Sequence, residues 1–74
     1  MLTKRGDILE MSNGDKYLVD DIKIVDNKEY IVLYSLEEGI YFIASEIVES
    51  GEPTYHILEK ETALQIAKKI DENR

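Results

Sequence analysis

The side chains that could support nucleophilic catalysis are sparse in this chain of 74 residues. It contains no cysteine and one histidine, His56, which lies between Tyr55 and Ile57 in a strand-like run. A serine nucleophile needs a histidine base and an orienting acid, and the chain has no Gly-x-Ser-x-Gly turn to present one. It also has no glycine-rich loop and no Gly-Lys-Ser/Thr sequence to hold a phosphate. We therefore predict that the protein is not an enzyme.

Metal chemistry is also poorly supported by the residue types. Without cysteine there is no disulfide framework and no zinc or iron–sulfur site built on thiolates. A calcium loop needs oxygen ligands at alternate positions with a glycine at the sharp turn, and no stretch fits that pattern. Side chains of adjacent acids, as in Asp20-Asp21 and Glu37-Glu38, diverge in a strand. We expect no metal and no other cofactor, and we interpret His56 as an ordinary strand histidine.

Acidic side chains are the chemistry that the chain has in quantity. The formal net charge is −7, and residues 7–52 carry twelve acids against three bases, whereas residues 53–74 carry four of each. A concentrated negative surface attracts a basic partner. It repels nucleic acid and anionic membranes, which bind basic patches. Binding to nucleic acid or to a membrane is therefore disfavoured. The acids that we predict to contact a partner are Asp20, Asp21, Glu37, Glu38, Glu46 and Glu49.

The elements that must position these acids are short strands separated by turns. Turn signals occur at Ser12–Asp15, Asp26–Lys28, Glu37–Gly39 and Ser50–Pro53. Between them we predict strands over about 7–11, 16–25, 29–35, 40–48 and 54–58. The Asp20-Asp21 pair interrupts the second run and indicates a bulge. The third and fourth runs are apolar on both faces, which predicts central strands that are covered on each side.

The last segment changes from strand to helix periodicity. Apolar residues at positions 63, 64, 66, 67 and 70 predict an amphipathic helix over about 61–71. Thr62 and Gln65 fit a capping box at its start. A helix this short needs a partner surface, and the exposed face of the sheet is the obvious one. The predicted fold class is α+β: a single domain, 1–74, with a five-stranded, strongly bent antiparallel meander and one C-terminal helix packed on it.

The five tyrosines, at positions 17, 30, 34, 41 and 55, raise the alternative of a surface that stacks nucleic-acid bases. That mode also needs a positive groove for the phosphate backbone, which an acidic sheet does not offer. Tyr30 and Tyr34 share a strand face with Val32 between them. We therefore predict that the tyrosines pack in the core or across strands.

The run Asp26-Asn27-Lys28-Glu29-Tyr30-Ile31-Val32-Leu33, with another hydrophobic strand and a C-terminal helix after it, resembles the small acidic bacterial proteins of the YrzB-like family. The resemblance covers about residues 15–70. The chain departs from that family because it lacks a long acidic run before the helix. The resemblance implies a soluble cytoplasmic α+β domain and no mechanism. The segments Gly6-Asp7-Ile8 and Tyr17-Leu18-Val19 are similar to the openings of SH3-like barrels.

Three hypotheses of function follow from these residues. The first is a non-enzymatic protein-interaction module, or a small phage-encoded inhibitor, that presents its acids to a basic partner surface. The second is a nucleic-acid-binding SH3-like domain. The third is a homodimer that completes its core through an edge strand or the helix. The longest apolar runs have five residues, so neither a signal peptide nor a membrane helix is predicted, and we expect a cytoplasmic location.

Overall fold

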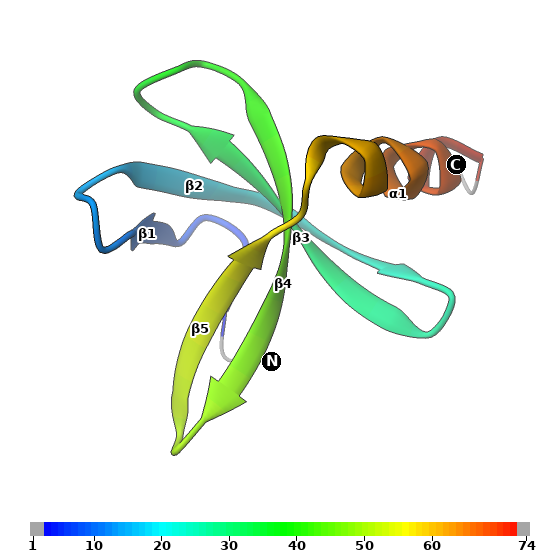
Figure 1. Ribbon diagram of the computed structural model, residues 1–74. Helices are drawn as coiled ribbons and strands as arrows, with labels where there is room; N and C mark the ends of the chain where they lie inside the picture. Colours follow the sequence, from blue (N-terminus) through cyan, green and yellow to red (C-terminus); the bar gives the residue numbers. More distant parts are fainter. Residues whose placement is uncertain (1–2, 73–74) are drawn as a thin grey trace.

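The computed structural model describes residues 3–72, whose strands form one antiparallel sheet (Figure 1). The elements are β1 (Ile8–Glu10), β2 (Lys16–Val25), β3 (Lys28–Ser35), β4 (Tyr41–Glu49), β5 (Glu52–Ile57) and α1 (Lys60–Glu72). Each strand pairs with the next along the chain, in the order β1-β2-β3-β4-β5. The sheet curls strongly into an open half-barrel, and α1 packs on it. The predicted α+β meander with one C-terminal helix is therefore confirmed.

Two of the hairpins use two-residue turns whose backbone follows the twist of the sheet. Asp26 and Asn27 have φ values of 51° and 65°, and Ser50 and Gly51 have φ values of 52° and 80°. Positive φ at both central residues defines the type I′ turn that suits a right-handed sheet twist. The second of these turns is shorter than predicted, because Pro53 lies inside β5 opposite Val48. An edge strand tolerates proline, since one side of its backbone has no neighbouring strand.

The interruption at Asp20-Asp21 is a bulge, as predicted. Val19 pairs with Leu33 and Asp21 pairs with Val32, so Asp20 is an extra residue in β2. Side chains alternate between the two faces of a strand, and one extra residue reverses that alternation. The bulge therefore places Val19, before it, and Ile22, after it, on the same face of the sheet.

That face lines the inside of the half-barrel and forms the main core. The inner core consists of the buried residues Tyr17, Val19, Ile31, Leu33 and Ala44. The ring of Tyr17 meets that of Phe42 edge to face, with 5.8 Å between centroids and an interplanar angle of 81°. The opposite face carries a smaller, helix-side cluster, in which Val25 and Ile43 of the sheet are buried with Ile66 of α1. β3 and β4 are thus apolar on both faces, in accord with their residue pattern.

The start of α1 differs from the prediction. The N–H of Ala63 donates to the carbonyl of Glu59 at 2.9 Å, so Glu59 is the N-cap and the helix begins at Lys60. The capping box with Thr62 at the cap is therefore wrong. Thr62 instead donates its hydroxyl proton to a carboxylate oxygen of Glu59 at 3.2 Å. At the other end of α1, the ammonium group of Lys69 lies 2.5 Å from a carboxylate oxygen of Asp26 in the β2–β3 turn.

One predicted docking residue of α1 is also placed differently. Leu64 was expected on the face that meets the sheet, but its side chain is 61% exposed. Each residue turns an α-helix by about 100°, so positions 66, 67 and 70 lie within about 60° of Ala63 around the helix axis. Leu64 lies about 100° from Ala63 and so points away from that stripe. The helix therefore buries a narrower stripe than the list of its apolar residues implies.

The segment before β1 forms hydrogen bonds with β2, β4 and β5. The N–H of Gly6 donates to the carbonyl of Val19, and the N–H of Val19 donates to the carbonyl of Asp7, both at 2.8 Å. Thr3 is buried, and its hydroxyl donates to a carboxylate oxygen of Glu46. The same hydroxyl lies 2.7 Å from the phenolic oxygen of Tyr55. Thr3 is thereby connected to β4 and β5.

Replacing this hydroxyl tests how much the connection contributes. We expect Thr3→Val, which keeps the shape of the side chain, to lower the free energy of unfolding by about 1–3 kcal/mol, because the buried hydrogen bond between Thr3 and the Glu46 carboxylate is lost. Urea denaturation measures the change. Thr54→Val in β5 is the matched control, since Thr54 is exposed. Equal stability of the two variants would contradict a structural role for the Thr3 hydroxyl.

Among residues 3–72, the structure has no helix with both the length and the apolar character that a membrane crossing requires.

Candidate functional site

The six acids predicted to contact a partner lie in three separate places. Asp20 and Asp21 are at the β2 bulge, and Glu37 and Glu38 are in the turn between β3 and β4. The remaining two, Glu46 and Glu49, are in the second half of β4, so the first half of that strand separates them from the Glu37–Glu38 turn. Four of the six are exposed, whereas Asp21 and Glu46 are half-buried. Glu46 faces the inner side of the sheet, where it accepts the hydrogen bond from Thr3.

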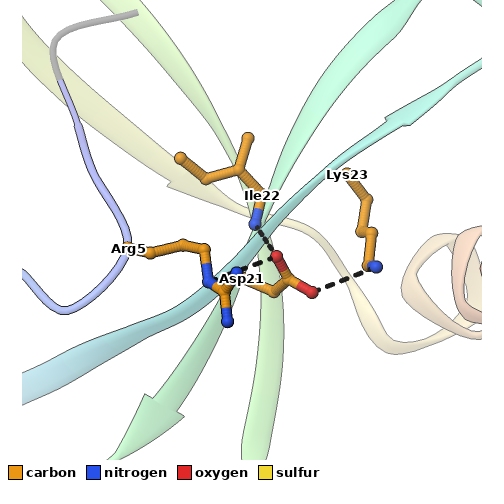
Figure 2. Close-up of polar contacts among 4 residues, drawn as sticks. All are labelled: Arg5, Asp21, Ile22 and Lys23. Atoms are coloured by element: carbon orange, nitrogen blue, oxygen red, sulfur yellow. Dashed lines mark hydrogen bonds and ion pairs between the residues drawn. The ribbon is translucent and has the colours of Figure 1, made fainter.

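Asp21 is held by two cationic side chains and by the backbone (Figure 2). One carboxylate oxygen lies 3.0 Å from the Lys23 ammonium, and the other lies 3.7 Å from Nε of Arg5. The N–H of Ile22 donates to the carboxylate at 2.8 Å. The hydrogen bond from Lys23, followed by the one from Ile22, lowers the pKa of Asp21 below its ordinary value. Asp21 is therefore a fixed negative charge that is already partly neutralised.

This lowered pKa makes Asp21 a contributor to stability that depends on pH. A carboxyl whose pKa is lower in the folded state stabilises the fold above its unfolded pKa, and the stabilisation is lost as the pH falls through the folded value. We expect Asp21→Asn to lower the free energy of unfolding by about 1 kcal/mol at pH 7. The difference from wild type should shrink toward pH 2. Urea midpoints measured between pH 2 and 7 test this, and a constant difference would contradict it.

Glu37 has a different electrostatic environment. A hydrogen bond with Asp15 and the repulsion between the two carboxylates raise the pKa of Glu37. Glu38 adds to the negative charge in the same turn. This turn thus concentrates exposed negative charge at the end of the β3–β4 hairpin, where a cation from another molecule would relieve the repulsion.

A feature missed in the sequence is a groove between α1 and the sheet. Its first part has a volume of about 540 Å³ and lies between the start of β4 with the preceding Ile40, and the α1 residues Ala63, Leu64 and Ala67. A second hollow, of about 420 Å³, shares Tyr41, Ile43 and Ala67 with the first. The two hollows therefore adjoin at these three residues beside the helix. We call the two hollows together the α1 groove.

The two ends of the α1 groove differ in chemistry. At the apolar end, the lining residues are hydrophobic except for Lys60, and Ile40, Tyr41 and Leu64 are 47%, 61% and 61% exposed. At the acidic end, the lining includes Asp20, Asp21 and Asp71, together with the single cation Lys23. Two of the six predicted acids, Asp20 and Asp21, thus line a concave surface, whereas Glu37, Glu38, Glu46 and Glu49 do not line it.

The tyrosines serve packing, as their strand positions predicted. Tyr34 and Tyr41 pair across β3 and β4, with 5.0 Å between ring centroids. Tyr30 packs in the helix-side cluster, and Tyr55 packs against the inner core. His56 is exposed on β5 opposite Ser45. Within residues 3–72, no group of three or more His, Cys, Asp or Glu side chains is arranged to hold a metal ion.

Comparison with protein-family models, with curated proteins and with solved structures finds no match for this chain.

Proposed function

We propose that this protein is a non-enzymatic interaction module of the cytoplasm that binds a basic surface of a partner protein. The observation that carries the proposal is the charge distribution: twelve acids against three bases over residues 7–52, beside a balanced C-terminal segment. Four of the six acids considered above are exposed, and they lie on strands and in a turn of the sheet. Such a surface accelerates encounter with a basic partner and discriminates against acidic ones. A small inhibitor that covers a nucleic-acid site on its target is the extreme form of this function.

The test compares the wild-type protein with a charge-reversed one. Glu37, Glu38 and Glu49 are changed together to lysine, since all three are exposed and none lines the α1 groove. Both proteins are immobilised and exposed to lysate of the source cell at low salt. A protein that is retained by the wild type alone is identified, purified and titrated. We expect its affinity to fall by about tenfold or more between about 50 and 300 mM salt, because exposed charges more than a Debye length apart are screened.

Two results would contradict the proposal. One is a retained protein whose affinity changes neither with salt nor with the triple reversal. The other is a gel shift of single-stranded RNA or DNA by the wild type at about micromolar strength and moderate salt, which would favour the nucleic-acid-binding alternative.

A further inference from the structure

The loop between β1 and β2 is built around Asn13-Gly14. The N–H of Gly14 donates to the carbonyl of Met11, and the N–H of Met11 donates to the carbonyl of Asp15, both at 2.9 Å. Gly14 has a φ of 91°, in the left-handed region that glycine adopts without strain. A turn that ends in a left-handed glycine is a common three-residue hairpin loop. The loop therefore consists of Ser12, Asn13 and Gly14.

The side chain of Asn13 folds toward Asp15. Its amide oxygen accepts a hydrogen bond from the N–H of Asp15 at 2.9 Å, and its amide nitrogen donates to a carboxylate oxygen of Asp15 at 3.0 Å. All three loop residues are exposed. Within residues 3–72, no atom beyond the chain neighbours of Gly14 lies within 4 Å of the position that a Cβ on Gly14 would take. Water therefore has access to the Asn13-Gly14 peptide.

An asparagine that precedes a glycine can lose its amide without an enzyme. The backbone nitrogen of Gly14 attacks Cγ of Asn13, because glycine has no Cβ to hinder the approach. An N–Cγ bond forms, the bond between Cγ and Nδ2 breaks, and the proton of the Gly14 nitrogen leaves with the amide as ammonia. Water then opens the resulting cyclic imide at one or the other carbonyl. The products are aspartate and isoaspartate, and no oxidant or reductant is needed.

The hydrogen bonds of the closed loop oppose this attack. The N–H of Gly14 is directed at Met11, and the amide of Asn13 is held by Asp15. These contacts must break before the nitrogen can reach Cγ, so the reaction requires an open loop. The opening is local, because β1 has three residues and lies at the edge of the sheet. Elements with few buried contacts open at a lower free energy than the whole domain unfolds.

We propose that Asn13 is deamidated spontaneously when the β1–β2 loop opens, and that isoaspartate at this position loosens the hairpin. Isoaspartate lengthens the main chain before Gly14 by one methylene, so the Gly14 N–H no longer fits the Met11 carbonyl. Either product also adds a carboxylate next to Asp15, which already repels Glu37. The net charge becomes one unit more negative than −7.

The test is incubation of the purified protein in neutral buffer, with peptide mapping by mass spectrometry at intervals. Asn27 is the matched control, because it is also exposed in a hairpin turn but is followed by Lys28. We expect the Asn13 amide to be lost about tenfold or more faster than the Asn27 amide, since a side chain at the following position hinders the attack. A parallel incubation in urea should accelerate the loss at Asn13, because the loop is then open.

Hydrogen exchange tests the effect on the hairpin. The isoaspartate form is separated from the unmodified protein by ion exchange. We expect its Met11 and Gly14 amides to exchange about tenfold or more faster than those of the wild type, while the Leu33 amide in the centre of β3 stays protected. Asn13→Asp is the control for charge, since it carries the added carboxylate on an unaltered main chain and should keep the wild-type exchange at Met11.

The inference is overturned if Asn13 and Asn27 lose their amides at the same rate, or if urea leaves the rate at Asn13 unchanged. It is also overturned if the isoaspartate form exchanges its Met11 amide as slowly as Asn13→Asp does.

Discussion

Deletion of Asp20 is expected to abolish cooperative folding. Without the extra residue, either Tyr17 and Val19 or Ile22 must leave the inner core for the opposite face, because a shift by one residue exchanges the faces of a strand. Tyr17 and Val19 are 6% and 1% exposed, and both belong to the inner core. A domain of this length has a free energy of unfolding of roughly 4–11 kcal/mol, so exposing two core side chains removes most of it.

The measurement is thermal and urea unfolding followed by circular dichroism, with amide dispersion in NMR spectra as an independent readout. Asp20→Ala is the control, because it keeps the number of residues and removes only an exposed carboxylate. We expect it to change the free energy of unfolding by no more than about 0.5 kcal/mol. A deletion variant with a sharp transition and native dispersion would show that β2 can repair its register by other means.

Leu33→Ala is expected to have the second-largest effect. Leu33 is fully buried at the centre of β3, with Val19 opposite it on β2 and Phe42 opposite it on β4. Truncation removes apolar contacts and leaves a cavity between two paired neighbours, at a cost of about 2–5 kcal/mol. In a domain this small, that loss brings the midpoint of unfolding close to ambient temperature.

Leu36→Ala provides the matched control, since the same atoms are removed from a side chain that is 50% exposed. We expect that variant to lose less than about 1 kcal/mol. Urea denaturation of both variants under identical conditions isolates the contribution of burial. Similar losses for the two leucines would mean that the interior of the half-barrel is not the main source of stability.

Much of the fold could be predicted because its local signals agree. Each turn carries residues that adopt positive φ, as Asp26 and Asn27 do, and each strand between turns is rich in β-branched or aromatic residues. The bulge could be predicted for a similar reason. Asp20 and Asp21 are poor strand formers in the middle of a long run, and a long strand in a strongly curved sheet needs a bulge or bend.

The candidate site could be predicted only in part. The excess of acids could be read from the composition. The positions of the six acids relative to one another depend on strand register, which cannot be read from the sequence. Glu46 follows Ala44 by two residues and therefore shares its inward face, an inference that requires knowing that Ala44 is in the core. The α1 groove depends on where the helix crosses the sheet. One signal of it was readable: Leu64 lies away from the stripe formed by its apolar neighbours.

The meander order also has a consequence for kinetics. Every strand pairs with its neighbour in sequence, whereas Thr3 reaches Glu46 and Tyr55 across 43 and 52 positions. Contacts between distant positions carry a larger loop-closure entropy and tend to form after local hairpins. We therefore expect the Thr3 contacts to be absent from the transition state for folding. Thr3→Val should then accelerate unfolding and leave the folding rate unchanged. The Thr3 contacts would therefore lengthen the lifetime of the folded state.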